Sequence, residues 1–151
     1  MTLQHKIILI ADTMKKNIIG TGKILFIDDD SELLHTLTNA FKPSSYDIEF
    51  YSEIKNAFAS LKKYQNNYSL LLADLSIVKS SGFIGKALKV IPKLPIIIFS
   101  GYEKNVYLKE KDNLFSKYSN LKGYLQKPIS FIDIIKAIDK YIDLEEINKQ
   151  K

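Results

Sequence analysis

The sequence predicts an α/β fold in which a parallel sheet is covered by helices. Short apolar runs alternate along the chain with amphipathic stretches of helical spacing, which is the pattern of repeated strand–helix units. The first clear run, at 23–27, is a continuous apolar run, as expected of a strand that is buried on both faces. With 151 residues and no long low-complexity linker, the chain has the size of one domain.

The first two strand–helix units are predicted between residues 23 and 61. The first strand, 23–27, is followed by three consecutive aspartates, and Pro43 closes the helix after it. A short strand is expected at 47–51, and Ser52 is a candidate N-cap for the second helix. The apolar faces of the two helices comprise Leu33, Leu34, Leu37, Ala40 and Phe41 in the first, and Ile54, Ala57, Phe58 and Leu61 in the second.

The third unit begins with a strand at 68–73 that ends at Asp74. A loop of Ser, Val and Lys residues is expected from there to Gly82, where a third helix begins. The apolar face of that helix comprises Phe83, Ala87, Leu88 and Ile91.

The fourth and fifth strands are predicted at 95–99 and 123–126. They end at Ser100 and Lys127, respectively. The stretch at 102–118 between them is polar and aromatic, and it occupies the place of the fourth helix.

The last helix is predicted to start at Ser130, with Asp133 at capping-box spacing. It closes a domain over 23–144, and a polar tail follows over 145–151. Residues 1–22 form an N-terminal extension whose run at 6–12 echoes the first strand. Three explanations of this extension stay open: an added edge strand, a dimer contact, or a start codon assigned too early. We expect the extension to have no catalytic role.

Polar residues stand where the predicted strands end, and the carboxyl ends of parallel strands share one edge of the sheet. Clustered carboxylates repel one another, and Mg²⁺, which prefers carboxylate, water and phosphate oxygens, would offset that repulsion. A lysine can pair with a carboxylate or a phosphoryl group, and an aspartate can form an aspartyl-phosphate. The residues concerned are Asp28, Asp29, Asp30, Asp74, Ser100 and Lys127. They indicate phosphoryl transfer, which needs mainly positioning and charge neutralisation.

Over about residues 23–141 the chain resembles the receiver domain of two-component response regulators. Five features match that family in order and spacing. They are a first strand followed by an acidic pair, a third strand that ends in an aspartate, a Ser/Thr position, an aromatic position, and a lysine before a cis-prolyl peptide. The matching residues are Asp28, Asp29, Asp74, Ser100, Tyr124, Lys127 and Pro128.

The resemblance implies a flavodoxin-like, doubly wound sheet of five parallel strands in the order 2-1-3-4-5, with helices on both faces. It implies that Asp74 accepts a phosphoryl group from the phosphohistidine of a sensor histidine kinase or histidine phosphotransfer protein. Ser100 and Lys127 would assist, and Ser100 and Tyr124 would act as switch residues toward a downstream protein. Mg²⁺ would be held by Asp28, Asp29, Asp74 and the backbone carbonyl of Ser76. Such a protein is a phospho-acceptor rather than an enzyme, apart from slow loss of its own phosphoryl group.

The chain departs from the receiver pattern in four places, one of which is the extension 1–22 that precedes the domain. Val78 stands where the family usually has proline, which predicts a less rigid loop after the acceptor. The stretch 100–127 is several residues longer than usual, so the usual signalling face is altered. The stretch 74–100 is slightly short.

Two other functions compete with this interpretation. One is a phosphatase of the haloacid-dehalogenase type with Asp28 as nucleophile, because Asp28 and Asp30 fit its Asp-x-Asp motif. Against it, Glu32 stands where that family has Thr or Val, and no late acidic pair is visible. The other is a pseudo-receiver that binds partners without phosphorylation.

The composition restricts partners and compartment. The chain has 22 lysines, no arginine and a formal net charge of +5. Since arginine is the usual bidentate reader of phosphate and guanine and the lysines are dispersed along the chain, we expect a solvated surface and no direct nucleic-acid partner. The absence of cysteine excludes disulfides and thiolate metal sites. With no export signal or membrane-length apolar run, we expect a cytoplasmic monomer or weak homodimer that does not bind membranes.

Overall fold

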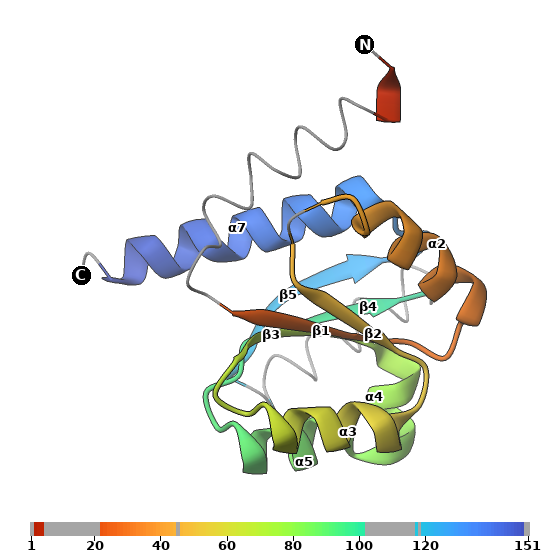
Figure 1. The fold of residues 1–151 in the computed structure, drawn as a ribbon. Helices are drawn as coiled ribbons and strands as arrows, with labels where there is room; N and C mark the ends of the chain where they lie inside the picture. Colours follow the sequence, from red (N-terminus) through yellow and green to blue (C-terminus); the bar gives the residue numbers. More distant parts are fainter. Residues whose placement is uncertain (1, 5–21, 45, 102–116, 118, 150–151) are drawn as a thin grey trace.

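The computed structural model describes residues 2–4, 22–44, 46–101, 117 and 119–149. Within them, one parallel sheet has the order β2-β1-β3-β4-β5 (Figure 1). This confirms the predicted doubly wound, flavodoxin-like arrangement. The strands are β1 (Lys23–Ile27), β2 (Ile48–Tyr51), β3 (Tyr68–Asp74), β4 (Ile96–Ser100) and β5 (Leu121–Gln126).

Helices cover both faces of the sheet, as predicted (Figure 1). Helices α2 (Ser31–Phe41) and α7 (Phe131–Lys149) lie on one face. On the opposite face lie α3 (Ile54–Lys63), α4 (Leu75–Ser81) and α5 (Phe83–Val90).

Each central strand supplies both hydrophobic cores, because successive side chains of a strand point to opposite faces. Ile24 and Phe26 of β1 pack in the core under α2 and α7, whereas Leu25 and Ile27 pack under α3, α4 and α5. All four side chains are buried. This two-sided burial explains why the strands read as continuous apolar runs.

The predicted capping box at the start of α7 is present. The backbone N–H of Asp133 donates to Ser130 Oγ at 3.2 Å, and the backbone N–H of Ser130 donates to Asp133 Oδ2 at 2.9 Å. Two orphan donors of the helix terminus are thereby satisfied. The helix continues to Lys149, so the tail predicted from residue 145 is helical up to that point.

Two local predictions were wrong. Ser52 does not cap α3, because the helix begins at Ile54 and its N-cap is Glu53, which makes no capping hydrogen bond with its side chain. The expected loop after Asp74 is the helix α4, whose N-terminus Asp74 caps. Gly82, at φ 64°, takes the left-handed conformation that ends α4.

The physical reason for α4 lies in tertiary packing. Its Leu75, Ile77 and Val78 are buried against the sheet, although this short segment shows little periodicity by itself. A proline at position 78 would lack the N–H that an α-helix bonds to the carbonyl of residue 74. Valine permits a regular helix there, where we had predicted a less rigid loop.

Part of the prediction lies outside the described residues. This applies to residues 1 and 5–21 of the extension and, apart from Lys117, to the stretch at 102–118.

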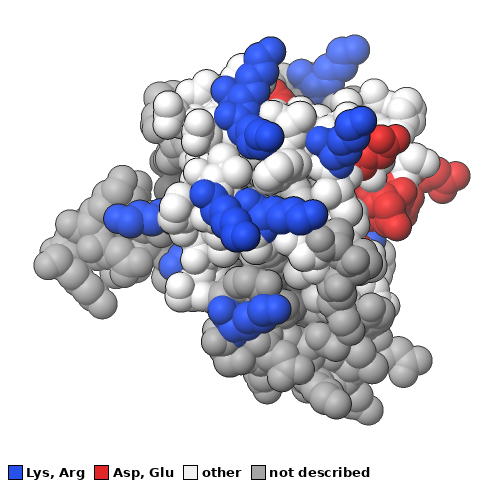
Figure 2. Space-filling view, turned by 90° about the horizontal axis from the view of Figure 1, so that it is seen from below, with Lys and Arg blue, Asp and Glu red and all other residues white. Residues whose placement is uncertain are grey.

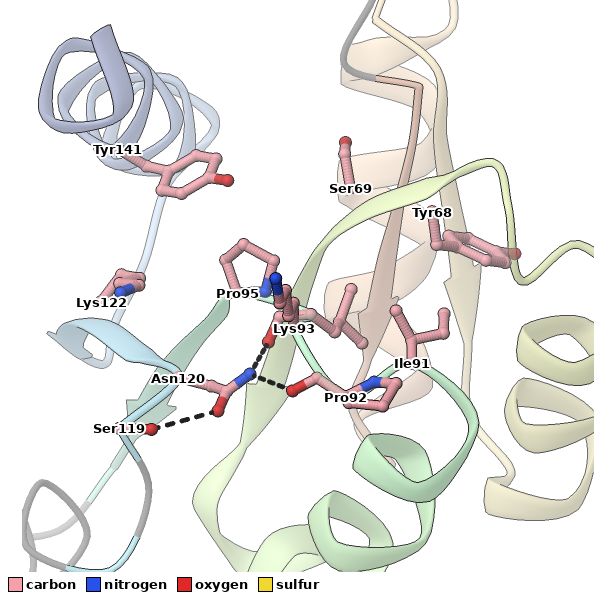
Figure 3. Close-up of a pocket in the computed structure, with 11 residues that line it drawn as sticks. Tyr68, Ser69, Ile91, Pro92, Lys93, Pro95, Ser119, Asn120, Lys122 and Tyr141 are labelled. Carbon is pink, nitrogen blue, oxygen red and sulfur yellow. Dashed lines mark hydrogen bonds between the residues drawn. The ribbon is translucent and has the colours of Figure 1, made fainter. Parts of the chain in front are cut away.

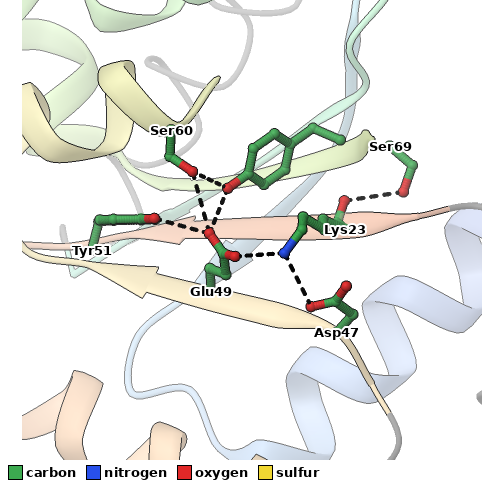
Figure 4. A network of polar contacts seen from close by, with 7 residues as sticks. Lys23, Asp47, Glu49, Tyr51, Ser60 and Ser69 are labelled. Atoms are coloured by element: carbon green, nitrogen blue, oxygen red, sulfur yellow. Dashed lines mark hydrogen bonds and ion pairs between the residues drawn. The ribbon is translucent and has the colours of Figure 1, made fainter. Parts of the chain in front are cut away.

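Glu49 ties the edge strand β2 to its neighbours (Figure 4). Its carboxylate receives Lys23 Nζ at 2.7 Å and the hydroxyls of Tyr68 at 2.7 Å, Tyr51 at 2.9 Å and Ser60 at 3.3 Å. Burial alone would raise the pKa of Glu49, but the hydrogen bonds from Lys23, Tyr68 and Tyr51 outweigh it and lower the pKa to about 2.

Candidate functional site

Four of the predicted polar residues meet at the carboxyl edge of the sheet. Asp28 follows β1, Asp74 ends β3, Ser100 ends β4 and Lys127 follows β5. Asp28, Asp74 and Ser100 are 0%, 5% and 2% exposed. Buried polar side chains at one sheet edge need partners, so their mutual contacts define the site.

Lys127 joins the two buried carboxylates. Its Nζ lies 2.8 Å from Asp28 Oδ2 and 3.1 Å from Asp74 Oδ1. The ammonium also lies 5.6 Å from the centroid of the Phe99 ring, which belongs to the intervening strand β4. Burial works to lower the pKa of Lys127, but the two carboxylates outweigh it and raise this pKa. The lysine is therefore a fixed positive charge at neutral pH.

The three consecutive aspartates have three different environments. Asp28 is buried, and its Oδ1 accepts the backbone N–H of Asp30 at 3.0 Å. Asp29 is exposed at the rim of the site. Asp30 is the N-cap of α2 and accepts the backbone N–H of Leu33 at 3.1 Å. Capping thus accounts for Asp30 alone, which leaves Asp28 and Asp29 for the site.

The carboxylates of Asp28, Asp29 and Asp74 fit a hard divalent cation. One oxygen from each lies within 4.8 Å of the other two. Oxygen ligands on opposite sides of Mg²⁺ stand about 4.2 Å apart, so small side-chain movements would complete such a set. Burial is the main cause that raises the pKa of Asp28, with a contribution from the neighbouring charge of Asp74, and Lys127 and the Asp30 N–H only partly oppose it. A further positive charge would relieve this excess of negative charge.

Ser76 contacts Asp74 through groups that the sequence interpretation did not consider. Its backbone N–H donates to Asp74 Oδ2 at 3.1 Å, and its hydroxyl also donates to that oxygen. Aspartate is a favoured N-cap residue, so Asp74 at the end of a strand was itself a signal for a helix that begins at the next residue. Ser76 lies in the first turn of α4, where carbonyls point along the helix away from Asp74. Its carbonyl as a metal ligand stays a prediction, and it requires this turn to unwind.

Ser100 and Tyr124 occupy the positions expected of them, while their switch roles stay predictions. Asp74 pairs with Phe99 across β3 and β4, so Ser100 lies one position beyond Asp74. The Ser100 carbonyl accepts the backbone N–H of Lys127 at 2.7 Å. Tyr124 is partly buried against the core beneath α3, α4 and α5. The peptide between Lys127 and Pro128 is cis, as the resemblance implied.

A separate cavity of about 540 Å³ lies at the opposite edge of the sheet, where β3, β4 and β5 begin (Figure 3). Asn120 organises its wall, because its side-chain amide donates to the carbonyls of Pro92 at 3.0 Å and Leu94 at 2.9 Å. The strands separate this cavity from Asp74, so it does not belong to the acidic site.

Comparison with protein families gives a match to the response regulator receiver domain over residues 24–139. The chain belongs to this family. None of the curated proteins compared matches the receiver.

Solved structures agree with this assignment in fold. A response regulator from Desulfuromonas acetoxidans has a TM-score of 0.67 at 20% identity, with 82% of this chain and 98% of that chain covered. A receiver domain from Clostridium thermocellum has a TM-score of 0.66 at 21% identity, with 83% of this chain and 98% of that chain covered. A third structure is a response regulator from Burkholderia pseudomallei with a phosphorylated aspartic acid, calcium ion and citrate. It has a TM-score of 0.59 at 18% identity, with 86% of this chain and 75% of that chain covered.

Family membership places the chain among the receivers of two-component signalling, which are typically phospho-acceptors rather than enzymes and generally partner histidine kinases. The receiver has an acidic pocket of Asp28, Asp29 and Asp74 beside Lys127. Among its described helices, none combines the length and apolar character needed to cross a membrane.

Proposed function

We propose that this receiver takes a phosphoryl group on Asp74 from the phosphohistidine of a sensor histidine kinase or histidine phosphotransfer protein. The observation that carries the proposal is the convergence of three carboxylates and Lys127 at one sheet edge, with Asp74 in contact with the lysine. The Burkholderia structure, which contains a phosphorylated aspartic acid and a calcium ion, supports both an aspartyl-phosphate and a divalent cation on this fold.

In the transfer, a carboxylate oxygen of Asp74 forms a bond to phosphorus while the phosphorus–nitrogen bond of phosphohistidine breaks. The bonding electron pair stays on the imidazole nitrogen of the donor. Lys127 lies 3.1 Å from Asp74 Oδ1, close enough to neutralise negative charge that develops on the phosphoryl oxygens. Ser100 would donate a hydrogen bond to one of those oxygens.

Mg²⁺ would be held by Asp28, Asp29 and Asp74, with the Ser76 carbonyl as a further candidate, and it would supply charge neutralisation of the phosphoryl oxygens. Asp28 and Asp74 are buried, so their charges are weakly screened and would hold the cation firmly. Lys127 is paired with both of these buried carboxylates, whereas the exposed Asp29 would contribute to the cation site from its rim.

The signal would leave the site through Lys127, Ser100 and Tyr124. Phosphorylation replaces the Asp74 carboxylate that Lys127 contacts, and this local charge change biases the neighbouring strand ends. A cavity of about 340 Å³ between β5 and α7, lined by residues that include Leu125, Ile129 and Lys136, offers a surface for a downstream protein.

Intact-mass spectrometry after incubation with Mg²⁺ and acetyl phosphate tests the proposal. The wild type should gain one phosphoryl group, and Asp74→Asn should gain none. Asp30→Asn is the matched control, because asparagine caps a helix as well as aspartate does, and it should be phosphorylated like the wild type.

Two results would contradict the proposal. The absence of an adduct on the wild type, together with no consumption of acetyl phosphate, would favour the pseudo-receiver. Consumption that survives Asp74→Asn but disappears in Asp28→Asn would favour the haloacid-dehalogenase-type phosphatase.

A further inference from the structure

The positive net charge of the chain originates in one segment. Residues 54–93 contain seven lysines and a single acidic residue, Asp74, which is buried in the site already described. The rest of the chain contains fifteen lysines and sixteen acidic residues, so it is close to neutral. The segment 54–93 includes α3, α4 and α5, which all lie on the same side of the sheet.

The fold gathers six exposed lysines of this segment into a surface that we call the basic face. They are Lys55, Lys62 and Lys63 on α3, Lys86 and Lys89 on α5, and Lys93 in the connection to β4. Figure 2, which looks at this side of the molecule, shows lysines spread over it and acidic residues toward its margins.

The ammonium groups of the basic face are available to an anion. Within the described part of the chain, none of the six forms an ion pair with a carboxylate, unlike Lys23 and Lys127. Two of them lie over aromatic rings instead: Lys62 is 5.3 Å from the Phe58 ring centroid and Lys63 is 5.2 Å from that of Tyr64. Lysines that form no ion pair with a carboxylate create a positive potential that attracts polyanions.

Dispersed lysines led us to expect no nucleic-acid partner from the sequence, but the fold brings six of them to one side of the sheet. We propose that the basic face binds the phosphate backbone of duplex nucleic acid without reading its sequence. Lysine is a point charge that neutralises phosphates, whereas base reading relies mainly on arginine, asparagine and glutamine. The ten residues of α3 span about 15 Å, a length over which duplex DNA carries about nine charges. The five lysines on the neighbouring helices α3 and α5 are therefore enough to neutralise about half of the phosphate charges along that length of duplex.

Other anionic partners fit the basic face less well. Protein interfaces are enriched in aromatic residues, methionine and arginine and depleted in lysine. Peripheral membrane binding relies on exposed apolar side chains, yet the large apolar residues that stand exposed in the described structure are Leu3 and Tyr64, and only Tyr64 adjoins this face. Single-stranded nucleic acid is usually held by several stacking aromatic rings, and the described residues of this face do not offer such a set.

Fluorescence anisotropy with a labelled 24-base-pair DNA duplex tests the proposal on the full chain. Binding should be equal for two unrelated sequences and should weaken about a thousandfold as KCl rises from 50 to 200 mM. If all six lysines contact phosphates, the slope of log K against log salt should be about −5.

Two triple variants with the same change in net charge separate the basic face from charge in general. Lys62→Gln, Lys86→Gln and Lys89→Gln together should reduce the slope to about −3 and weaken binding at least tenfold at 50 mM KCl. Lys42→Gln, Lys136→Gln and Lys140→Gln, which change exposed lysines outside the basic face, should leave binding within about twofold of the wild type.

Equal loss in the two variants would overturn the proposal, because net charge and not this face would then control binding. Absence of duplex binding at 50 mM KCl would also overturn it. So would a wild type that sediments with vesicles containing 30% phosphatidylserine but does not bind the duplex, since the partner would then be a membrane. These outcomes do not depend on whether Asp74 is phosphorylated.

Discussion

The ammonium of Lys127 lies 2.8 Å from a carboxylate oxygen of Asp28, although β3 and β4 separate their strands in the sheet. The lysine side chain spans this distance past Phe99 and contacts Asp74 on the way. Asp28 is fully buried, so its negative charge depends on a partner that reaches it across the sheet. The same lysine is therefore both a structural counter-charge and a member of the candidate site.

Lys127→Met should destabilise the protein in the absence of divalent cations, because it leaves Asp28 buried and unpaired. We expect a loss of about 1–3 kcal/mol, less than for a fully buried pair, because the Lys127 side chain is 23% exposed. Urea unfolding in EDTA measures it. Lys136→Met, on the exposed side of α7, should change stability by less than about 0.5 kcal/mol.

Adding Asp28→Asn to Lys127→Met should recover at least half of that loss, since the unpaired charge is then removed. A double variant as unstable as the single one would show that the lysine acts through packing over Phe99 instead.

Mg²⁺ should stabilise the wild type against thermal unfolding, and Asp29→Asn should weaken that effect at least tenfold in apparent affinity. A ligand that binds only the folded state adds about 2.7 kcal/mol at one hundred times its Kd. Asp29 is exposed, so its substitution should not disturb folding. Differential scanning calorimetry across a Mg²⁺ titration measures the shift.

Asp30→Asn is the matched control for this titration, because it removes the same charge one residue away and keeps the cap of α2. It should respond to Mg²⁺ like the wild type. An equal loss in both variants would mean that Mg²⁺ acts on general surface charge.

Stability should depend on Glu49 in the acid range. Its pKa is lowered to about 2 in the folded protein from 4.5, so its ionised form contributes stability above about pH 4.5. That contribution is lost as pH falls through about 2. At pH 7, Glu49→Gln should cost about 1–2 kcal/mol, because four donors lose a charged acceptor.

Chemical unfolding from pH 7 to pH 2.5 measures this dependence. The difference between the wild type and Glu49→Gln should shrink as pH falls, whereas the exposed Glu53→Gln should differ little from the wild type throughout. A pH-independent difference would show that the Glu49 charge is not what holds β2 in place.

Two glycines should respond in opposite directions to alanine. Gly82 has φ 64°, and a Cβ added there would meet no atom within 4 Å, so Gly82→Ala should cost about 1 kcal/mol through backbone strain alone. Gly85 has equal space inside α5, so Gly85→Ala should stabilise the protein by about 0.5–1 kcal/mol. Thermal unfolding of both variants checks the pair, and a gain from Gly82→Ala would contradict the role of Gly82 in ending α4.

Local patterns were sufficient for most elements and insufficient for a few. The capping box of α7 was predictable because Ser130 and Asp133 satisfy each other within one turn. The helix α4 was not, because its stability depends on the burial of Leu75, Ile77 and Val78 by the sheet and on the conformation of Gly82. The N-cap predicted at Ser52 lies one residue before the actual N-cap of α3, Glu53, because tertiary packing decides at which residue a helix begins.

The sequence by itself determined the class of fold and which polar residues gather at the candidate site. The central strands are apolar runs, and the carboxyl ends of parallel strands lie at one edge of the sheet, so the residues that follow the strands identify Asp28, Asp74, Ser100 and Lys127 together. Only the tertiary structure decided that Asp28 is buried, that Asp29 is exposed at the rim of the site and that Asp30 caps α2. It also decided that the lysines dispersed along α3 and α5 form one face. The physical reason is that side-chain environments arise from packing between segments distant in the chain, which local periodicity does not encode.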